Sequence, residues 1–235
     1  MILIDNIETP KVSWEHAIRG MRNPLNSWDN LDSHFEPWCD VEEVAPGVTY
    51  FSGVLKAPTG LGPNDKNLAT ILAKSGSSHA KYRRMIVVYC DITAPLYWWK
   101  EFDTYKVGTV ANSCSTMHKI TAKHFELRDF STDQIFDCTE VIFEDVIRHL
   151  NKMRKLYLQE EDPEIKKGYW WQIIQLLPSS YNQKRTVMMN YEVLANIYKD
   201  RKSHKLDEWR MFCNVMRESL PYSELFTMEE PVSKS

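Results

Sequence analysis

The sequence predicts an α+β fold in which a small mixed or antiparallel sheet accompanies a majority of helices. A nearly continuous run of apolar, mostly β-branched residues at 85–92 (MIVVYCDI) has the pattern of a strand buried on both faces. The segment 140–159 repeats its apolar residues at helical spacing, and the last third of the chain has an almost entirely helical pattern. These three observations favour a few strands surrounded by helices.

The N-terminal quarter of the chain combines two short elements with a long irregular stretch. A strand is predicted at 2–7, and a helix at 14–21 for which Ser13 is the expected N-cap. Prolines and glycines then interrupt the pattern from about 22 to 63, which indicates a long insertion over the surface with one hairpin near 48–55.

Proline and glycine positions also delimit the elements of the remaining chain. Pro95 ends the buried strand, and Pro178 ends a later helix. The other elements predicted after the insertion are a helix at 64–76, a helix at 96–105, a strand at 119–125, and helices at 140–159, 169–177, 186–202 and 205–220. Since no internal repeat or linker divides the sequence, one domain over 1–235 is expected.

Composition and charge exclude several classes of protein. The chain has 235 residues, of which 43% are hydrophobic and 12% aromatic, as in globular proteins. Lys and Arg total 29 against 32 Asp and Glu, a net charge of −3, so duplex nucleic acid is not an expected partner. No apolar run approaches the roughly 18 residues of a membrane-spanning helix, and the N-terminus lacks a signal-peptide pattern. Five scattered cysteines without a CxxC pair predict a reduced, cytoplasmic location.

Local catalytic and metal motifs do not occur in the sequence. There is no GxGxxG, P-loop, HExxH, GxSxG or EF-hand pattern, so the residues alone assign no catalytic group. His118 and His124 lie near Cys114, but no second cluster would complete a tetrahedral metal site. No metal is therefore predicted.

Two short polar segments could bind a ligand or could be ordinary surface. His79 stands in the run HAKYRR with Arg83 and Arg84, just before the buried strand. These side chains suit an anion, although a solvated strand edge has the same composition. The run of small polar residues at 111–118 (ANSCSTMH) could bring backbone amides close to an anion, or simply form a polar loop.

The predicted helix at 186–202 gives a more specific indication. Asn190 and Arg201 are eleven residues apart, which places both on the face that carries the apolar contacts of the helix. A guanidinium on such a face needs an anionic partner. That partner is either a ligand phosphate or a carboxylate of the fold, for example Glu192, Glu208 or an acid from another helix.

The segment 177–209 resembles the corresponding region of the flavin-dependent thymidylate synthases, which reads roughly LP…T…NxRxLxNxxxxR…HAQxE. The matching residues, the later ones at unbroken spacing, are Leu177, Pro178, Thr186, Asn190, Leu194, Asn196 and Arg201, with His204 and Glu208 as approximate counterparts further on. Upstream, 72–84 resembles the family's GHxSxxEH segment, in which His79 takes the place of a histidine. The opening strand and Ala17-Ile18-Arg19 resemble the family's N-terminus.

This resemblance implies an α+β fold that assembles as a homotetramer, with flavin and nucleotide sites at subunit junctions. It also implies reductive methylation of dUMP to dTMP, with methylenetetrahydrofolate as carbon donor, FAD as redox carrier and NADPH as reductant. By position, Arg201 resembles a nucleotide-binding arginine, and Arg83 and Arg84 are further cations for the nucleotide. The residues that resemble flavin contacts are His79, Asn190, Asn196, Asn112 and Ser115.

Two departures from the family pattern leave the reaction open. When the signature RHRxxSxNxxSxRY is aligned on Asn112 and Ser115, residues 105–107 (Tyr-Lys-Val) stand where RHR is expected, and Glu192 replaces an arginine of the later helix. Arg and Lys are not equivalent in bidentate phosphate recognition. Three hypotheses follow: a divergent flavin-dependent enzyme, an inactive nucleotide- or protein-binding module that kept the fold, and an unrelated helical scaffold with Trp-rich packing.

Overall fold

The computed structural model describes residues 2–35, 39–45, 48–54 and 60–230, with backbone alone for 39–54. Its centre is a four-stranded antiparallel sheet with the order β1-β4-β6-β5. These strands are β1 (Leu3–Glu8), β4 (Val87–Pro95), β5 (Val110–Ser113) and β6 (Asn182–Asn190). Together with the predominance of helices, this sheet confirms the predicted α+β class, and the sheet is of the antiparallel kind.

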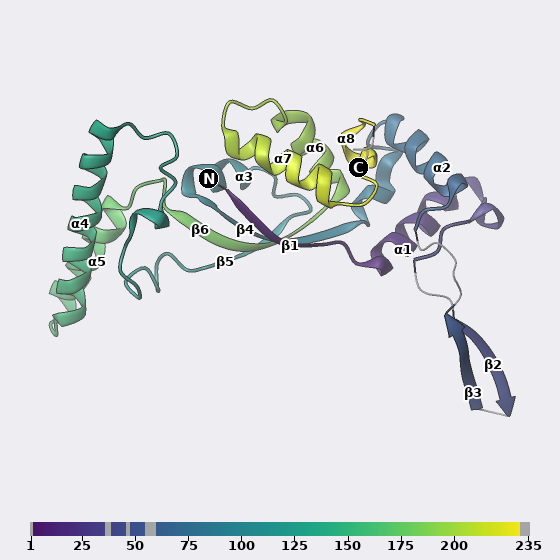
Figure 1. The fold of residues 1–235 in the computed structure, drawn as a ribbon, viewed down its shortest axis with the longest axis horizontal. Helices are drawn as coiled ribbons and strands as arrows, with labels where there is room; N and C mark the ends of the chain where they lie inside the picture. Colours follow the sequence, from purple (N-terminus) through teal and green to yellow (C-terminus); the bar gives the residue numbers. More distant parts are fainter. Residues whose placement is uncertain (1, 36–38, 46–47, 55–59, 231–235) are drawn as a thin grey trace.

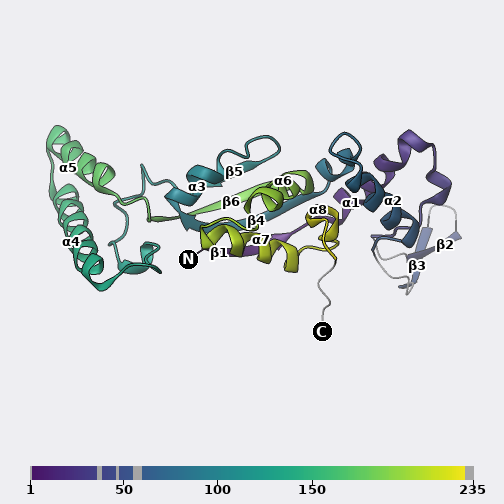
Figure 2. The ribbon, with the colours of Figure 1, turned by 90° about the horizontal axis from the view of Figure 1, so that it is seen from above.

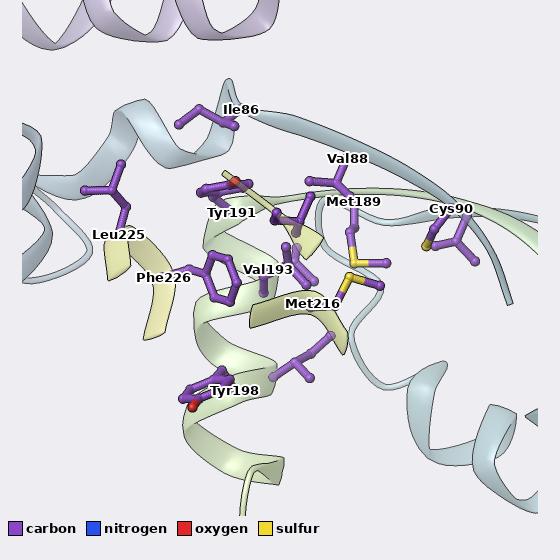
Figure 3. Close-up of a cluster of buried hydrophobic side chains, with 14 of the residues drawn as sticks. Ile86, Val88, Cys90, Met189, Tyr191, Val193, Tyr198, Met216, Leu225 and Phe226 are labelled. Carbon is purple, nitrogen blue, oxygen red and sulfur yellow. The ribbon is translucent and has the colours of Figure 1, made fainter. Parts of the chain in front are cut away.

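Helices cover one face of the sheet. The helices α6 (Tyr191–Arg201) and α7 (Asp207–Ser219) lie above the strands, and α3 (Leu96–Phe102) packs beside them (Figures 1 and 2). Alternate residues of the strands fill the interface: Val88, Cys90 and Ile92 from β4, and Val187 and Met189 from β6. Figure 3 shows Met189 of β6 close to Met216 of α7, with Val193 of α6 beside them.

The other face of the sheet remains open in this chain. Leu3, Tyr89 and Val110 are 57%, 44% and 61% exposed. The prediction that 85–92 is a strand buried on both faces is therefore wrong. Because the helices gather on one side of this antiparallel sheet, only that face is buried. The apolar residues of β4 that point to the other side stay at the surface.

Two N-terminal helices and the last helix of the chain lie together at one end of the sheet (Figure 1). They are α1 (Lys11–Arg22), α2 (Pro63–Lys74) and the short α8 (Glu224–Thr227), with 3₁₀ turns η1 (Asn23–Leu25), η2 (Trp28–Asn30) and η3 (Ala80–Arg84). The predicted N-cap Ser13 is wrong, because α1 begins after Pro10 and the Ser13 hydroxyl donates to the Pro10 carbonyl at 2.7 Å.

The insertion contains the hairpin that its sequence predicts. Strands β2 (Cys39–Ala45) and β3 (Val48–Val54) pair antiparallel, with Val41 opposite Phe51. The predicted boundary of this hairpin, 48–55, covers its second strand, and residue 55 lies outside the described residues.

Helices α4 (Asp137–Gln159) and α5 (Pro163–Leu176) form an arm at the opposite end of the sheet (Figures 1 and 2). They pack on each other around Leu150 and Ile173, both fully buried, in a cluster separate from the central core. The Asp162 carboxylate caps α5 by accepting from the amides of Glu164 and Ile165 at 2.9 and 3.2 Å. The prediction of one domain over 1–235 stays a prediction.

Two predicted elements are wrong. Residues 119–125, predicted as a strand, form turns and bends that lead to the 3₁₀ turn η4 (Leu127–Asp129). Ile120 and Phe125 of this segment are buried in the core of the arm. Residues 186–190 belong to β6, where Val187 and Met189 face the core in alternation with outward neighbours. Period-two burial against β4 therefore overrides the helical pattern until Asn190.

Candidate functional site

The residues that the sequence places in a ligand site gather around α6. Asn190 ends β6 and caps this helix, because its side-chain Oδ1 accepts from the amides of Glu192 and Val193 at 3.1 and 3.0 Å. Arg201 is the last residue of α6. Asn190 is therefore not on a helical face as expected, and the helix separates the two side chains along its whole length.

The loop that follows α3 runs along α6 and contacts residues at both ends of that helix. At one end, the Tyr105 hydroxyl accepts from Arg201 Nε at 2.9 Å. At the other end, Gly108 lies so close that an added Cβ would be 2.9 Å from Asn190 Nδ2, and its φ of +84° is a conformation that favours glycine. The segment 105–108, which stands where the family signature would be, thus runs beside α6.

Arg201 forms an internal ion pair. Its Nη1 lies 2.7 Å from Glu101 Oε2, which also accepts from the indole of Trp209 at 3.0 Å. The guanidinium lies over the Trp209 ring, 4.9 Å from its centroid, and 3.0 Å from His204 Nε2. With 19% of the side chain exposed, Arg201 is held between an aromatic ring and a carboxylate. A carboxylate partner was one of the two alternatives for this residue.

The carboxylate that neutralises Arg201 is an acid from another helix, Glu101 of α3, and is neither Glu192 nor Glu208. Glu208 accepts from the Tyr97 hydroxyl instead, and Glu192 pairs with Arg83. No local spacing identifies Glu101, because it is one hundred residues from Arg201 along the chain. Burial raises the pKa of the Tyr105 hydroxyl that completes this cluster, so it stays protonated.

Arg83 and Glu192 form a second, more deeply buried ion pair at the first turn of α6. Arg83 Nη2 lies 2.8 Å from Glu192 Oε2, and Arg83 Nη1 donates to the Leu225 carbonyl at 3.2 Å. The two residues are 5% and 8% exposed. Glu192 therefore neutralises an arginine supplied by η3. This pairing explains why a carboxylate stands at a position where the family pattern has an arginine.

Buried polar atoms without partners occur close to this pair. Arg83 Nε and the hydroxyl of Thr109, the residue after Gly108, are buried and form no hydrogen bond within the described residues. Such atoms cost free energy unless a ligand or water satisfies them.

The remaining predicted contacts lie at the surface. His79, Arg84 and Asn196 are exposed, and across residues 60–230 no ion pair or side-chain hydrogen bond engages them. Asn112 is exposed on the edge strand β5, opposite Thr186. Ser115 lies beyond that strand, where its Oγ accepts from the His118 amide at 2.9 Å.

Ser115 also lines a separate pocket of about 310 Å³ at the end of β5 and β6. Lys123, Arg128 and Lys184 line this pocket, and each of them forms an ion pair, with Asp129, Glu126 and Asp91 respectively. The structure thus brings Arg83, Asn190 and Arg201 to α6 and places Ser115 in a different pocket.

Groups of three or more metal-ligating side chains are not found in the part of the chain that the structure describes. Within the same residues, no helix has the length and hydropathy needed to cross a membrane.

The fold of this chain is similar to that of the flavin-dependent thymidylate synthases. A structure of thymidylate synthase X from Helicobacter pylori with FAD and dUMP matches with a TM-score of 0.61 at 16% identity, over 99% of this chain and 98% of that chain. A second structure of that enzyme, also with FAD and dUMP, matches with a TM-score of 0.61 at 16% identity, over 99% of each chain.

A third similar structure is the UMP/dUMP methylase PolB from Streptomyces cacaoi, bound with 5-Br dUMP. Its TM-score is 0.58 at 13% identity, over 99% of this chain and 97% of that chain. No protein-family model and no curated protein sequence matches the chain. At these identities the likeness establishes the fold, and this confirms the fold that the sequence resemblance implies.

Proposed function

We propose that the protein is a divergent flavin-dependent enzyme that reductively methylates dUMP or a related pyrimidine nucleotide. The carbon donor would be methylenetetrahydrofolate and the reductant NADPH. The observation that carries this proposal is a fold shared, over 99% of the chain, with an enzyme crystallised with FAD and dUMP and with a UMP/dUMP methylase. Fold alone does not fix function, so the proposal also needs a site that fits.

The residues around the start of α6 fit a polar ligand. Arg83 Nε and the Thr109 hydroxyl are buried and have no hydrogen-bond partner within the described residues. In the proposed site FAD contacts His79, Asn190 and Asn196, with Asn112 and Ser115 as further contacts from the edge of the sheet. FAD supplies the redox chemistry when bound, and the chain orients it.

Arg201, Arg83 and Arg84 are the cations proposed for the nucleotide, and they differ in how readily a phosphate could reach them. Arg201 and Arg83 each face a carboxylate, so a phosphate must compete with Glu101 or Glu192 for them. Arg84 is exposed and has no ion pair within the described residues, so its planar fork is available for a phosphate at once. A phosphate bound by Arg84 would therefore lie beside η3, at the end of α6 opposite to Arg201.

The protein would act as a homotetramer in the cytoplasm. The open face of the sheet, with Leu3, Tyr89 and Val110 exposed, is a surface that association could cover. Cys90, Cys114, Cys138 and Cys213 carry no disulfide, in keeping with a reducing compartment.

A second candidate function is an inactive module that binds a nucleotide or a protein on the same fold. The two carboxylates that neutralise Arg201 and Arg83 favour it, as does the absence of arginine and histidine at 105–107. This module would bind a nucleotide without flavin.

Flavin binding separates the two functions. Purified protein titrated with FAD and with FMN should develop the flavin absorbance bands near ~370 and ~450 nm in a protein-bound form. A complex that converts dUMP in the presence of methylenetetrahydrofolate and NADPH would establish the reaction. If neither flavin binds at high concentration, the proposal of a flavoenzyme is wrong.

The role of Arg201 has its own test. Loss of a charge-assisted phosphate contact costs about 1.5–3 kcal/mol, so Arg201→Ala should weaken dUMP binding roughly ten- to a hundredfold while the circular dichroism spectrum is retained. Lys199→Ala is the matched control, because Lys199 is an exposed cation on the same helix. If Arg201→Ala unfolds the protein and shows no specific loss of dUMP binding, the ion pair between Arg201 and Glu101 is purely structural.

A further inference from the structure

The C-terminal half of α4 carries a concentration of positive charge far from the α6 site. An open hollow of about 530 Å³ lies there, between the helix and the segment that precedes η4. Its cationic lining consists of Arg148, Lys152, Arg154 and Lys155, with His124 beside them, and no carboxylate lines it. In a chain of net charge −3, composition alone does not account for such a cluster.

The floor of this hollow is held in place by hydrogen bonds. The Asn151 side chain accepts from the Phe125 amide and donates to the Phe125 carbonyl, both at 2.9 Å. Arg154 Nε donates to the Thr121 carbonyl at 2.9 Å, and its Nη2 donates to the Ala122 carbonyl at 3.2 Å. These contacts fix the helix against 121–125, so the cations face a preformed surface.

The charge of the cluster is almost entirely uncompensated. Arg154 is bound by carbonyl oxygens, which carry no formal charge. Lys152, Lys155 and His124 form no ion pair within the described residues. Arg148 pairs with Asp145, but both side chains are more than 60% exposed, so the pair contributes little.

The geometry points to a binding site for a small polyanion, and we propose that the hollow binds a molecule carrying two or more phosphate or carboxylate groups. Arg148, Lys152 and Lys155 follow one another at intervals of four and three residues, so they share one face over about 10 Å of helix. The fixed guanidinium of Arg154 gives directional donors, and the two lysines give mobile point charges. This inference is independent of the proposed function.

Calorimetric titration of the full-length protein with tripolyphosphate tests the site. We expect saturable binding at low ionic strength that weakens as salt is added. The variant Lys152→Gln/Lys155→Gln should lose at least about tenfold in affinity. The variant Lys74→Gln/Lys100→Gln removes two exposed lysines from α2 and α3, so it has the same net charge and should bind as the wild type does.

Two further measurements make the result specific. Titration with tricarballylate, a tricarboxylate, distinguishes a carboxylate ligand from a phosphate ligand, and binding of either anion with the lysine dependence stated above supports the site. Arg84→Gln tests the alternative that the anion occupies the nucleotide site near α6. The inference is overturned if the wild type binds neither anion, if both lysine pairs lower the affinity equally, or if Arg84→Gln alone abolishes binding.

Discussion

The Arg22–Asp65 ion pair gives the sharpest stability prediction, because Asp65 is the carboxylate that hydrogen-bonds the buried guanidinium of Arg22 directly. Asp65 is fully buried, and its Oδ1 lies 2.5 Å from Arg22 Nε, whose side chain is 4% exposed. The other carboxylate oxygen of Asp65 accepts from the amides of Asp32 and Ser33 at 3.0 and 2.9 Å. The Asp65 side chain of α2 thus binds both the last residue of α1 and the backbone of the insertion at Asp32 and Ser33.

The substitution Asp65→Asn keeps the shape of the side chain and removes its charge. Arg22 then remains buried without a carboxylate on its Nε, and its Nη2 has no hydrogen-bond partner even in the wild type. The neighbouring Asp32 carboxylate attracts Arg22, but its two oxygens accept from the Asn64 and Asp65 amides. Breaking a buried pair in this way costs about 3–5 kcal/mol. Asn retains one acceptor oxygen for the two amides, so we expect a value near the lower end, still a large part of the roughly 5–15 kcal/mol that stabilises a typical protein.

Urea unfolding followed by tryptophan fluorescence measures this free energy of unfolding. Asp29→Asn is the control, since Asp29 is an exposed carboxylate at the start of the same insertion and should change stability by less than about 0.5 kcal/mol. The double variant Arg22→Met/Asp65→Asn should recover much of the loss, because it leaves no unpaired charge and keeps an acceptor oxygen for the Asp32 and Ser33 amides. A loss below about 1 kcal/mol for Asp65→Asn would refute the reasoning.

Three other predictions concern the sheet, the arm and the thiols. Hydrogen bonds from Thr186, Asn6 and Lys184 lower the pKa of Asp91 from 3.8 to about 2, so its stabilising contribution is present above 3.8 and is lost as the pH falls through about 2; Asp91→Asn should flatten acid unfolding over that range. Leu150→Ala, at a fully buried site, should lower the free energy of unfolding by about 2–5 kcal/mol in urea titrations. Mass spectrometry after alkylation of the native protein should show modified Cys114 and Cys138 but protected Cys90 and Cys213, whose pKa values burial raises to about 12.

Elements with a single strong periodicity were predictable from the sequence. The amphipathic pattern at 140–159 corresponds to α4, which begins three residues earlier, and Pro95 does separate β4 from α3. The prediction was wrong where tertiary pairing decides between two plausible patterns. Residues 186–190 fit a helix by local pattern, but pairing with β4 buries Val187 and Met189 on one face and makes the segment a strand.

The association of Asn190 and Arg201 with one helix was predictable from the sequence, but the partners of the two residues were not. Spacing and residue type pointed to Asn190 and Arg201, and the structure places both on α6 or at its cap. The partners of these residues come from α3, from the loop after it and from η3, far along the chain, and no local spacing encodes contacts of that kind. Glu101 and Tyr105 were missed for this reason.

The arrangement of charge around α6 bears on how a divergent sequence could keep a nucleotide site. The cations expected at 105–107 are absent, and two of the arginines that could replace them are already neutralised, Arg201 by Glu101 and Arg83 by Glu192. A phosphate with about two negative charges competes well with a single carboxylate for an arginine whose side chain is 19% exposed, because both anions offer the same paired acceptors. It competes poorly for Arg83, because opening that buried pair would leave Glu192 charged and desolvated. Nucleotide binding by this chain should therefore depend on Arg201 and the exposed Arg84, while Arg83 holds η3 against α6.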